Sequence, residues 1–155
     1  MAQDIKIADI AIIGTGPAGI SAAITAKIRN KEILLFGAEP VSSKVAKAHR
    51  ILNYPGLPAV SGEELAQAYK RHLDELQIAV TKKRVHAVYA MGSYFALQAG
   101  DEQYRADSVI LACGMTADKP FPGENEFLGR GVSYCATCDA QFFKGKTVAV
   151  IGYTK

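Results

Sequence analysis

A glycine-rich turn, Gly14-Thr15-Gly16-Pro17-Ala18-Gly19, lies between a short apolar run and an alanine-rich stretch. The apolar run at 9–13 is typical of a buried parallel strand, and the stretch at 20–30 contains no glycine or proline and predicts a helix. A second apolar run at 33–36 predicts another strand. Because the G-x-G-x-x-G motif is credible only between a strand and a helix, this order predicts an α/β dinucleotide-binding fold with a parallel sheet.

The residues of this turn have separate expected roles. Gly14 allows the tight turn, Gly16 lets the backbone approach a pyrophosphate at the helix N-terminus, and Gly19 lets helix and strand pack closely. Pro17 suits the first helical turn, where its missing N–H is not needed. Glu39 lies about 20 residues after Gly19, where a carboxylate can accept hydrogen bonds from ribose hydroxyls. The alternative is a glycine-rich turn that binds no ligand.

A second chemical signal is the pair Cys135-Ala136-Thr137-Cys138, at a predicted junction between a loop and a helical turn. A disulfide across two residues constrains the unfolded chain very little, so reversible electron transfer explains the pair better than stability does. Asp139 follows directly and could exchange a proton with a leaving thiol. Zinc binding and an incidental pair are the alternatives, but zinc needs four ligands and the sequence has no second pair. The other cysteine and the histidines are scattered: Cys113, His49, His72 and His86.

The middle of the chain predicts a helix and a small antiparallel meander. Ser61-Gly62-Glu63-Glu64 is a capping box that begins a helix. Its expected core face is Leu65, Tyr69, Leu73 and Leu76. Short alternating runs between 78 and 105 predict the meander, and 108–112 returns to a buried strand. Cys113 is expected to be a small buried side chain, and Gly114 would let a ligand approach the end of that strand.

The loop at 38–58 has no clear period. Asn53-Tyr54-Pro55-Gly56 predicts an ordered turn. Lys44 and His49 lie in this loop and could face a cofactor; an ordinary exposed side chain is the alternative for His49.

Composition excludes several classes of function. The 155 residues carry a net charge of +3 with no long Lys/Arg run, which argues against a nucleic-acid partner. No apolar run is long enough to span a bilayer, and the start lacks a signal-peptide core. Three cysteines, an odd number, do not make a structural disulfide framework, so a reducing cytoplasm fits best.

Prolines and glycines between 118 and 131 predict a linker and a domain boundary. After the cysteine pair, residues 146–152 read as the first strand of another nucleotide-binding unit. A lone first strand has no partner within its own unit, so the chain is expected to be an incomplete protein.

Together these motifs resemble the N-terminal part of the low-molecular-weight thioredoxin reductases. The resemblance covers essentially the whole chain, and the run around the cysteine pair is its most specific match. The matching runs are Gly14-Thr15-Gly16-Pro17-Ala18-Gly19, Asn53-Tyr54-Pro55-Gly56, Val109-Ile110-Leu111-Ala112-Cys113-Gly114, Pro122-Gly123-Glu124, and Gly131-Val132-Ser133-Tyr134-Cys135-Ala136-Thr137-Cys138-Asp139.

The resemblance implies a Rossmann-like FAD-binding domain at 1–117, discontinuous in the family, with a parallel sheet, helices and a small antiparallel meander. Residues 118–155 would be the linker and the start of a second nucleotide-binding-like domain that carries the cysteine pair. Cys135 and Cys138 would form the redox disulfide that reduces thioredoxin, with Asp139 as proton donor or acceptor. The implied FAD contacts are Gly14, Gly16, Pro17, Ala18, Gly19, Glu39, Asn53, Val85, Ala112 and Gly114, with Lys44 as a further candidate. The family forms homodimers.

Three departures from the family pattern bear on the electron donor. Val41-Ser42-Ser43-Lys44 stands where the family has Gly-Gly-Gln-Leu, and Cys113 replaces a threonine. An NADPH-binding unit should open Gly-x-Gly-x-x-Ala after its first strand, but here Gly152 is followed by Tyr153-Thr154-Lys155. A tyrosine where the backbone must approach a pyrophosphate blocks that approach, since only glycine lacks a Cβ. The pattern is similar to the ferredoxin-dependent flavin thioredoxin reductases, so reduced ferredoxin is the first expected donor and NADPH the second. A flavin-binding fragment without turnover and a zinc-binding module are the remaining alternatives.

Overall fold

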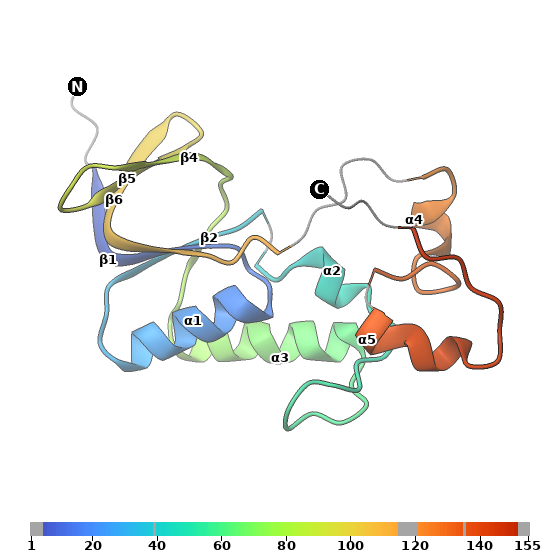
Figure 1. The fold of residues 1–155 in the computed structure, drawn as a ribbon. Coiled ribbons are helices and arrows are strands. Elements are labelled where there is room, and N and C mark those ends of the chain that lie inside the picture. The colour runs from blue at the N-terminus through green and yellow to red at the C-terminus, as the bar shows by residue number, and fades with distance from the viewer. Residues whose placement is uncertain (1–4, 39, 115–120, 135, 152–155) are drawn as a thin grey trace.

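A computed structural model describes residues 5–38, 40–114, 121–134 and 136–151. Its centre is a six-stranded sheet in the order β3-β2-β1-β6-β5-β4 (Figure 1). The strands are β1 (Lys6–Ile13), β2 (Ile33–Phe36), β3 (Val80–Thr81), β4 (Val85–Ala90), β5 (Phe95–Ala99) and β6 (Glu102–Leu111). The helices are α1 (Pro17–Ile28), α2 (Ser43–Ala46), α3 (Gly62–Glu75), α4 (Glu124–Phe127), α5 (Ala136–Asp139) and the 3₁₀ turn η1 (Ala140–Phe143). The α/β class with a Rossmann-like parallel sheet and an antiparallel meander is confirmed.

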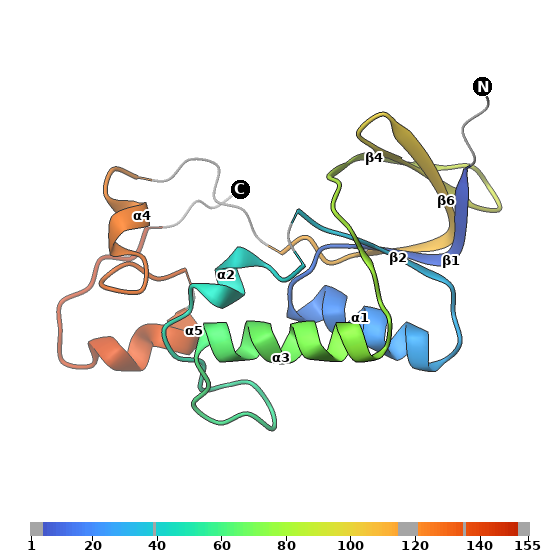
Figure 2. The ribbon, with the colours of Figure 1, turned by 180° about the vertical axis from the view of Figure 1, so that it is seen from behind.

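Parallel pairing of β1 with β2 and β6 forms the half of the sheet that the glycine motif predicted. Helices α1 and α3 cover one face of this half (Figures 1 and 2). Side chains alternate between the two faces of a strand, so Ile12 faces α1 and α3 while Ala11 faces the meander. The core under the helices is Ile12, Ile20, Ala23, Leu35, Leu65, Tyr69, Leu73 and Ile78.

Strands β4, β5 and the first half of β6 form the meander. It packs on the face of the parallel strands that lies opposite α1 and α3. Antiparallel pairing joins β4 to β5 and β5 to β6. The rings of Phe36 and Tyr104 meet edge to face, with centroids 4.9 Å apart, and fix the meander on the parallel strands. Strand β6 is therefore shared, since residues 102–106 pair with β5 and residues 104–111 pair with β1.

The expected helix start at the capping box is confirmed. The Ser61 hydroxyl accepts from the Glu64 backbone N–H at 3.2 Å, and Glu64 Oε2 accepts from the Ser61 backbone N–H at 2.9 Å. Leu65, Tyr69 and Leu73 are buried as expected, and Leu76 is half-buried. Helix α1 begins at Pro17, which occupies the first turn as its missing N–H allows.

Several expectations about the strands need correction. The meander's last strand and the strand expected at 108–112 are one continuous strand, because no glycine or proline interrupts 102–111. Its end is not buried: Ile110 is 38% exposed and Leu111 72% exposed. Cys113, expected to be buried, is exposed. Residues 146–151 form no strand, and Val150 is 92% exposed, because a single strand needs a partner.

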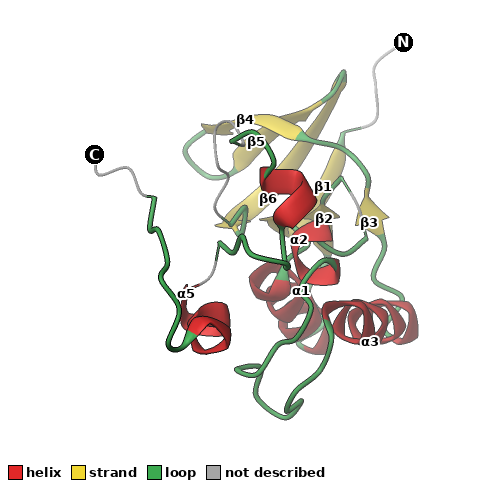
Figure 3. Cartoon of the chain, turned by 90° about the vertical axis from the view of Figure 1, so that its right-hand side faces the viewer, coloured by secondary structure: helices red, strands yellow, loops and turns green. Residues whose placement is uncertain are grey.

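Viewed from the side in Figure 3, α5 and residues 140–151 stand apart from the sheet and its two long helices. None of the helices in the described part of the chain has the length and apolar character that crossing a bilayer requires.

Candidate functional site

The turn after β1 has the tight geometry that its glycines predict. Gly14 has a φ of +123°, and its backbone N–H donates to the Phe36 carbonyl at 2.8 Å. A Cβ on Gly14 would lie 2.2 Å from the Ala112 carbonyl oxygen, and a Cβ on Gly19 would lie 1.9 Å from the Gly14 carbonyl oxygen. Only glycine fits at either position, so the turn, the start of α1 and the end of β6 are packed backbone against backbone.

Gly16 differs from Gly14 and Gly19, because the space where its side chain would stand is open. It is the N-cap of α1, and a Cβ there would meet no atom within 4 Å. The cap makes no side-chain hydrogen bond to the first turn of the twelve-residue helix. The open backbone and the partial positive charge of the helix start fit a dinucleotide pyrophosphate. This fit rests on the shape of the turn; the contact itself stays a prediction, as it does for Pro17 and Ala18, both exposed at the start of α1.

Ala112 and Gly114 end beside this turn. The Ala112 backbone N–H donates to the Ile13 carbonyl at 2.8 Å, which continues the pairing of β6 with β1 by one residue. Gly114 has a φ of +66° and open space where a side chain would stand. The carboxyl ends of β1, β2 and β6 therefore meet around the glycine turn, where ligands bind in open α/β sheets.

The remaining candidate FAD contacts lie on three other elements. Val85 starts β4 and packs against the meander core. Lys44 is on α2, whose N-cap residue Ser42 donates its backbone N–H to the Thr15 carbonyl of the glycine turn at 2.9 Å. Asn53 is exposed in the loop before α3. Glu39 lies outside the described residues.

Helix α5 begins at Ala136, within the segment that carries the cysteine pair. Cys135 is outside the described residues, and only the backbone of Cys138 is described, so their pairing stays a prediction. Asp139 is half-buried, and its Oδ2 accepts a hydrogen bond from the Ser133 hydroxyl at 2.5 Å. Ser133 thus orients the carboxylate expected to handle the proton. No sequence signal pointed to it, since a loop brings the two residues together.

Tyr134 connects the cysteine segment to α2 and α4. The Lys44 ammonium lies 5.9 Å from the centre of the Tyr134 ring. A hydrogen bond to Glu124 raises the pKa of the Tyr134 hydroxyl. Segments from α2, α4 and the loop before α5 therefore meet at one side chain.

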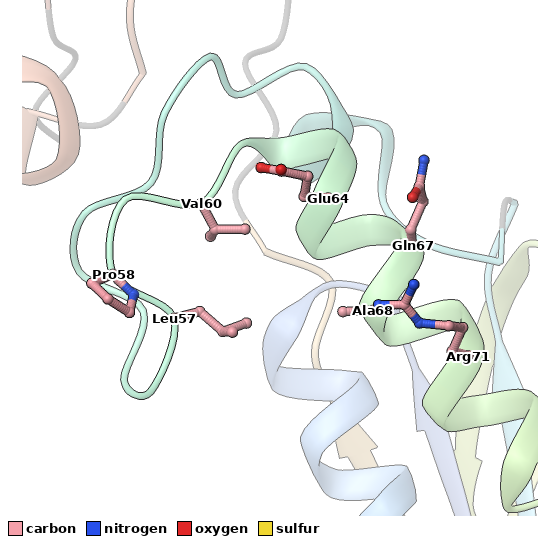
Figure 4. Close-up of a pocket in the computed structure, with 7 residues that line it drawn as sticks. All are labelled: Leu57, Pro58, Val60, Glu64, Gln67, Ala68 and Arg71. Atoms are coloured by element: carbon pink, nitrogen blue, oxygen red, sulfur yellow. The ribbon is translucent and has the colours of Figure 1, made fainter.

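Surface hollows in the described part of the chain lie on either side of the start of α3. One of about 490 Å³ lies between the loop before α3 and the outer face of that helix, away from the glycine turn (Figure 4). It is lined by Leu57, Pro58, Val60, Glu64, Gln67, Ala68 and Arg71. A second, of about 300 Å³, lies between the end of α2 and the turn at 128–130. Within the described residues no three His, Cys, Asp or Glu side chains gather as a metal site would require.

Comparison with known proteins assigns the family. The sequence profile for pyridine nucleotide-disulphide oxidoreductases matches residues 8–153. The chain is 40% identical over 156 residues to the thioredoxin reductase of Aquifex aeolicus, covering 98% of this chain and 48% of that protein.

Solved structures give the same result. The ferredoxin-flavin thioredoxin reductase of Clostridium acetobutylicum is 52% identical with a TM-score of 0.71, covering 97% of this chain and 52% of that chain. The thioredoxin reductase of Streptococcus pyogenes is 34% identical with a TM-score of 0.77, covering 88% and 45%. The chain spans about half the length of the curated relatives it matches. It belongs to the pyridine nucleotide-disulphide oxidoreductase family, whose thioredoxin reductase members are FAD-binding flavoproteins.

Proposed function

We propose that this chain carries the FAD site and the redox cysteine pair of a thioredoxin-disulfide reductase. The observation that carries the proposal is the 52% identity, over 97% of the chain, to a ferredoxin-flavin thioredoxin reductase. The open backbone at Gly16 supports it independently, because a dinucleotide needs that approach. Residues 1–117 would form the flavin-binding domain and 118–155 the start of the second domain.

Bound FAD would supply two-electron chemistry, and the chain's own residues would hold it and pass the electrons on. Gly16 would let the pyrophosphate approach the start of α1, in a turn that Gly14 and Gly19 keep tight. Cys135 and Cys138 would exchange with the thioredoxin disulfide through a mixed disulfide. Asp139, oriented by the Ser133 hydroxyl, would take up or release the accompanying proton.

Reduced ferredoxin is the proposed donor, and NADPH is the second candidate. Tyr153 supports ferredoxin over NADPH as the donor. A tyrosine in the predicted NADPH-binding turn would block the approach of the backbone to a pyrophosphate. This position lies outside the described residues. The second candidate draws support from the family itself, which is named for pyridine nucleotides. The complete protein is proposed to be a homodimer.

Anaerobic titration of the FAD-loaded protein tests these proposals. We expect reduced ferredoxin to bleach the flavin at a catalytic rate and NADPH not to do so. Cys135→Ser and Cys138→Ser should each abolish thioredoxin reduction while the yellow colour persists. Stoichiometric bleaching by NADPH would overturn the donor assignment. Turnover by either serine variant would overturn the role of the cysteine pair.

A further inference from the structure

One surface of the molecule is basic and carries little opposing charge. Residues 40–62 contain Lys44, Lys47, His49 and Arg50 but no Asp or Glu. Lys47, His49 and Arg50 are all exposed. A distant basic residue, Arg130, joins them across the hollow of about 300 Å³.

The hollow brings the two segments together at close range. Its lining residues are Ala46, Lys47, Ala48, His49, Ser61, Glu63, Leu128, Gly129 and Arg130. A Cβ on Gly129 would lie 3.8 Å from the Lys47 carbonyl oxygen. Lys47 and Arg130 therefore flank one shallow depression although 83 positions separate them in the numbering.

We propose that this basic surface, defined as Lys47, His49, Arg50 and Arg130, docks the acidic face of a small one-electron carrier protein. The inference rests on the proposed function and assigns the donor its docking surface. Two carriers, each oxidised by one electron, supply the two electrons that with two protons convert one disulfide into two thiols.

The surface is rigidly supported, which lowers the entropy lost on docking. The Gly62 backbone N–H donates to the Ala48 carbonyl at 2.8 Å, and a Cβ on Gly62 would lie 2.0 Å from the Val45 carbonyl oxygen. A further backbone bond, from Ile51 to Val60 at 2.7 Å, closes the loop that follows. The basic side chains thus project from backbone that is fixed against the start of α3.

Two glutamates follow shortly after Ser61 at the edge of the hollow, and the carboxylate of one, Glu64, is engaged by the Ser61 backbone N–H and hydroxyl. Glu63 is the one acidic side chain that lines the hollow, against the permanent charges of Lys47 and Arg130. Arg130 also donates to the Glu126 backbone carbonyl at 3.1 Å, which holds its guanidinium on the turn, and the Glu126 side chain is exposed nearby. The remaining charge is positive and accessible, and such a surface steers an acidic partner into encounter.

The location suits an electron donor. Helix α2 is attached to the glycine turn by the hydrogen bond from Ser42 to Thr15 at 2.9 Å, so the basic surface follows directly from an element of the flavin site. The turn at Gly129 and Arg130 leads into the cysteine segment. A carrier docked here would contact both α2, which is bonded to the glycine turn, and the turn that precedes the cysteine segment.

A pair of charge-reversal variants tests the proposal. Lys47→Glu/Arg130→Glu reverses the basic surface, and Lys82→Glu/Arg84→Glu reverses two exposed cations between β3 and β4 with the same change in net charge. The probe is an acidic [2Fe–2S] ferredoxin, measured in two ways at low and high salt. Rapid mixing with the reduced form gives the second-order rate of flavin reduction, and titration with the oxidised form gives binding without turnover.

We expect the first variant to lose about tenfold or more in both rate and affinity at low salt, with a flatter salt dependence, and the control to change by less than about twofold. Dithionite should reduce the flavin equally in all three proteins. Equal losses in the two variants would overturn the docking assignment. Displacement of oxidised ferredoxin by NADP⁺ would also overturn it, because the basic surface would then bind a nucleotide phosphate. Failure of ferredoxin to reduce the unaltered protein, with binding intact, would instead refute the proposed donor.

Discussion

The three glycines of the turn after β1 differ in what one added methyl group would touch. Gly19→Ala places a Cβ 1.9 Å from a backbone oxygen that cannot move without opening the turn, whereas Gly16→Ala meets open space. We expect Gly19→Ala to lower the free energy of unfolding by about 1–3 kcal/mol or more. Gly16→Ala should change it by less than about 1 kcal/mol and yet weaken FAD binding. Denaturant unfolding and flavin absorbance measure the two effects separately.

The matched pair separates packing from ligand contact. Normal flavin content in Gly16→Ala would refute the role assigned to that glycine. Native stability in Gly19→Ala would show that the turn relaxes more easily than its backbone contacts indicate.

A second residue-scale prediction concerns Tyr104 at high pH. Its ring is 2% exposed and its hydroxyl donates to Glu102 at 2.5 Å, so burial, with help from that bond, raises the pKa of Tyr104 to about 12 from a usual value of 10.0. Between these values the unfolded chain loses a proton that the folded chain keeps. Stability contributed by this group is therefore full below about pH 10 and is lost as pH rises through about 12.

Tyr104→Phe should make the fall in stability between pH 10 and 12 less steep, at a loss of about 0.5–1.5 kcal/mol near neutral pH for the missing hydrogen bond. Denaturant midpoints across this range measure it. Tyr89→Phe, which removes a hydroxyl from a side chain 58% exposed, controls for the loss of a tyrosine. An unchanged slope in Tyr104→Phe would contradict the argument.

What the sequence predicts at this scale depends on whether the cause is local. Gly14 and Gly19 were predictable because a turn between strand and helix restricts backbone geometry within six residues. The exposure of Cys113 and the hydrogen bond from Ser133 to Asp139 were not, because both depend on which distant segment covers a residue or brings it close.

At the scale of elements, the start of α3 offers a direct test. Ser61 and Glu64 exchange hydrogen bonds across the first turn. The bond from the Ser61 backbone N–H and the bond from its hydroxyl, the one that Ser61→Ala removes, both lower the pKa of the Glu64 carboxyl. Ser61→Ala should cost about 0.5–2 kcal/mol of stability at neutral pH. The contribution of the ionised Glu64 is present above its usual pKa of 4.5 and is lost as pH falls through its lower folded value, so the difference between variant and parent should shrink in acid.

Ser42→Ala is the matched control, because Ser42 caps α2 without a side-chain hydrogen bond. Thermal unfolding of both variants at neutral and acidic pH measures the difference. A loss in Ser42→Ala as large as in Ser61→Ala would contradict the assignment of the capping box.

Long elements with a clear period were predictable and short ones were not. The core face of α3 follows from apolar residues three and four apart, whereas the four-residue α2 has no period to detect. The division of β6 into two strands was wrong because its two halves have different partners, and a change of partner leaves no mark in the sequence.

At the scale of the whole molecule, the outer edge of β6 beyond its pairing with β5 is one open edge of the sheet among the described strands. Pairing with β5 ends at Ala106, so among the described strands residues 108–111 pair with β1 alone. Leu111 is 72% exposed beside Ile110 at 38%. An apolar edge of this kind is a template for another strand.

We therefore expect the chain to self-associate through this edge at micromolar concentration. Leu111→Lys should weaken the association by at least about tenfold, because a charged side chain at an open edge opposes strand pairing. Ile28→Lys, which removes an apolar side chain 65% exposed at the end of α1, is the control and should leave association unchanged. Sedimentation velocity across a concentration series measures both. If Leu111→Lys associates as strongly as the unaltered chain, contacts elsewhere hold the copies together and the edge of β6 is not the interface.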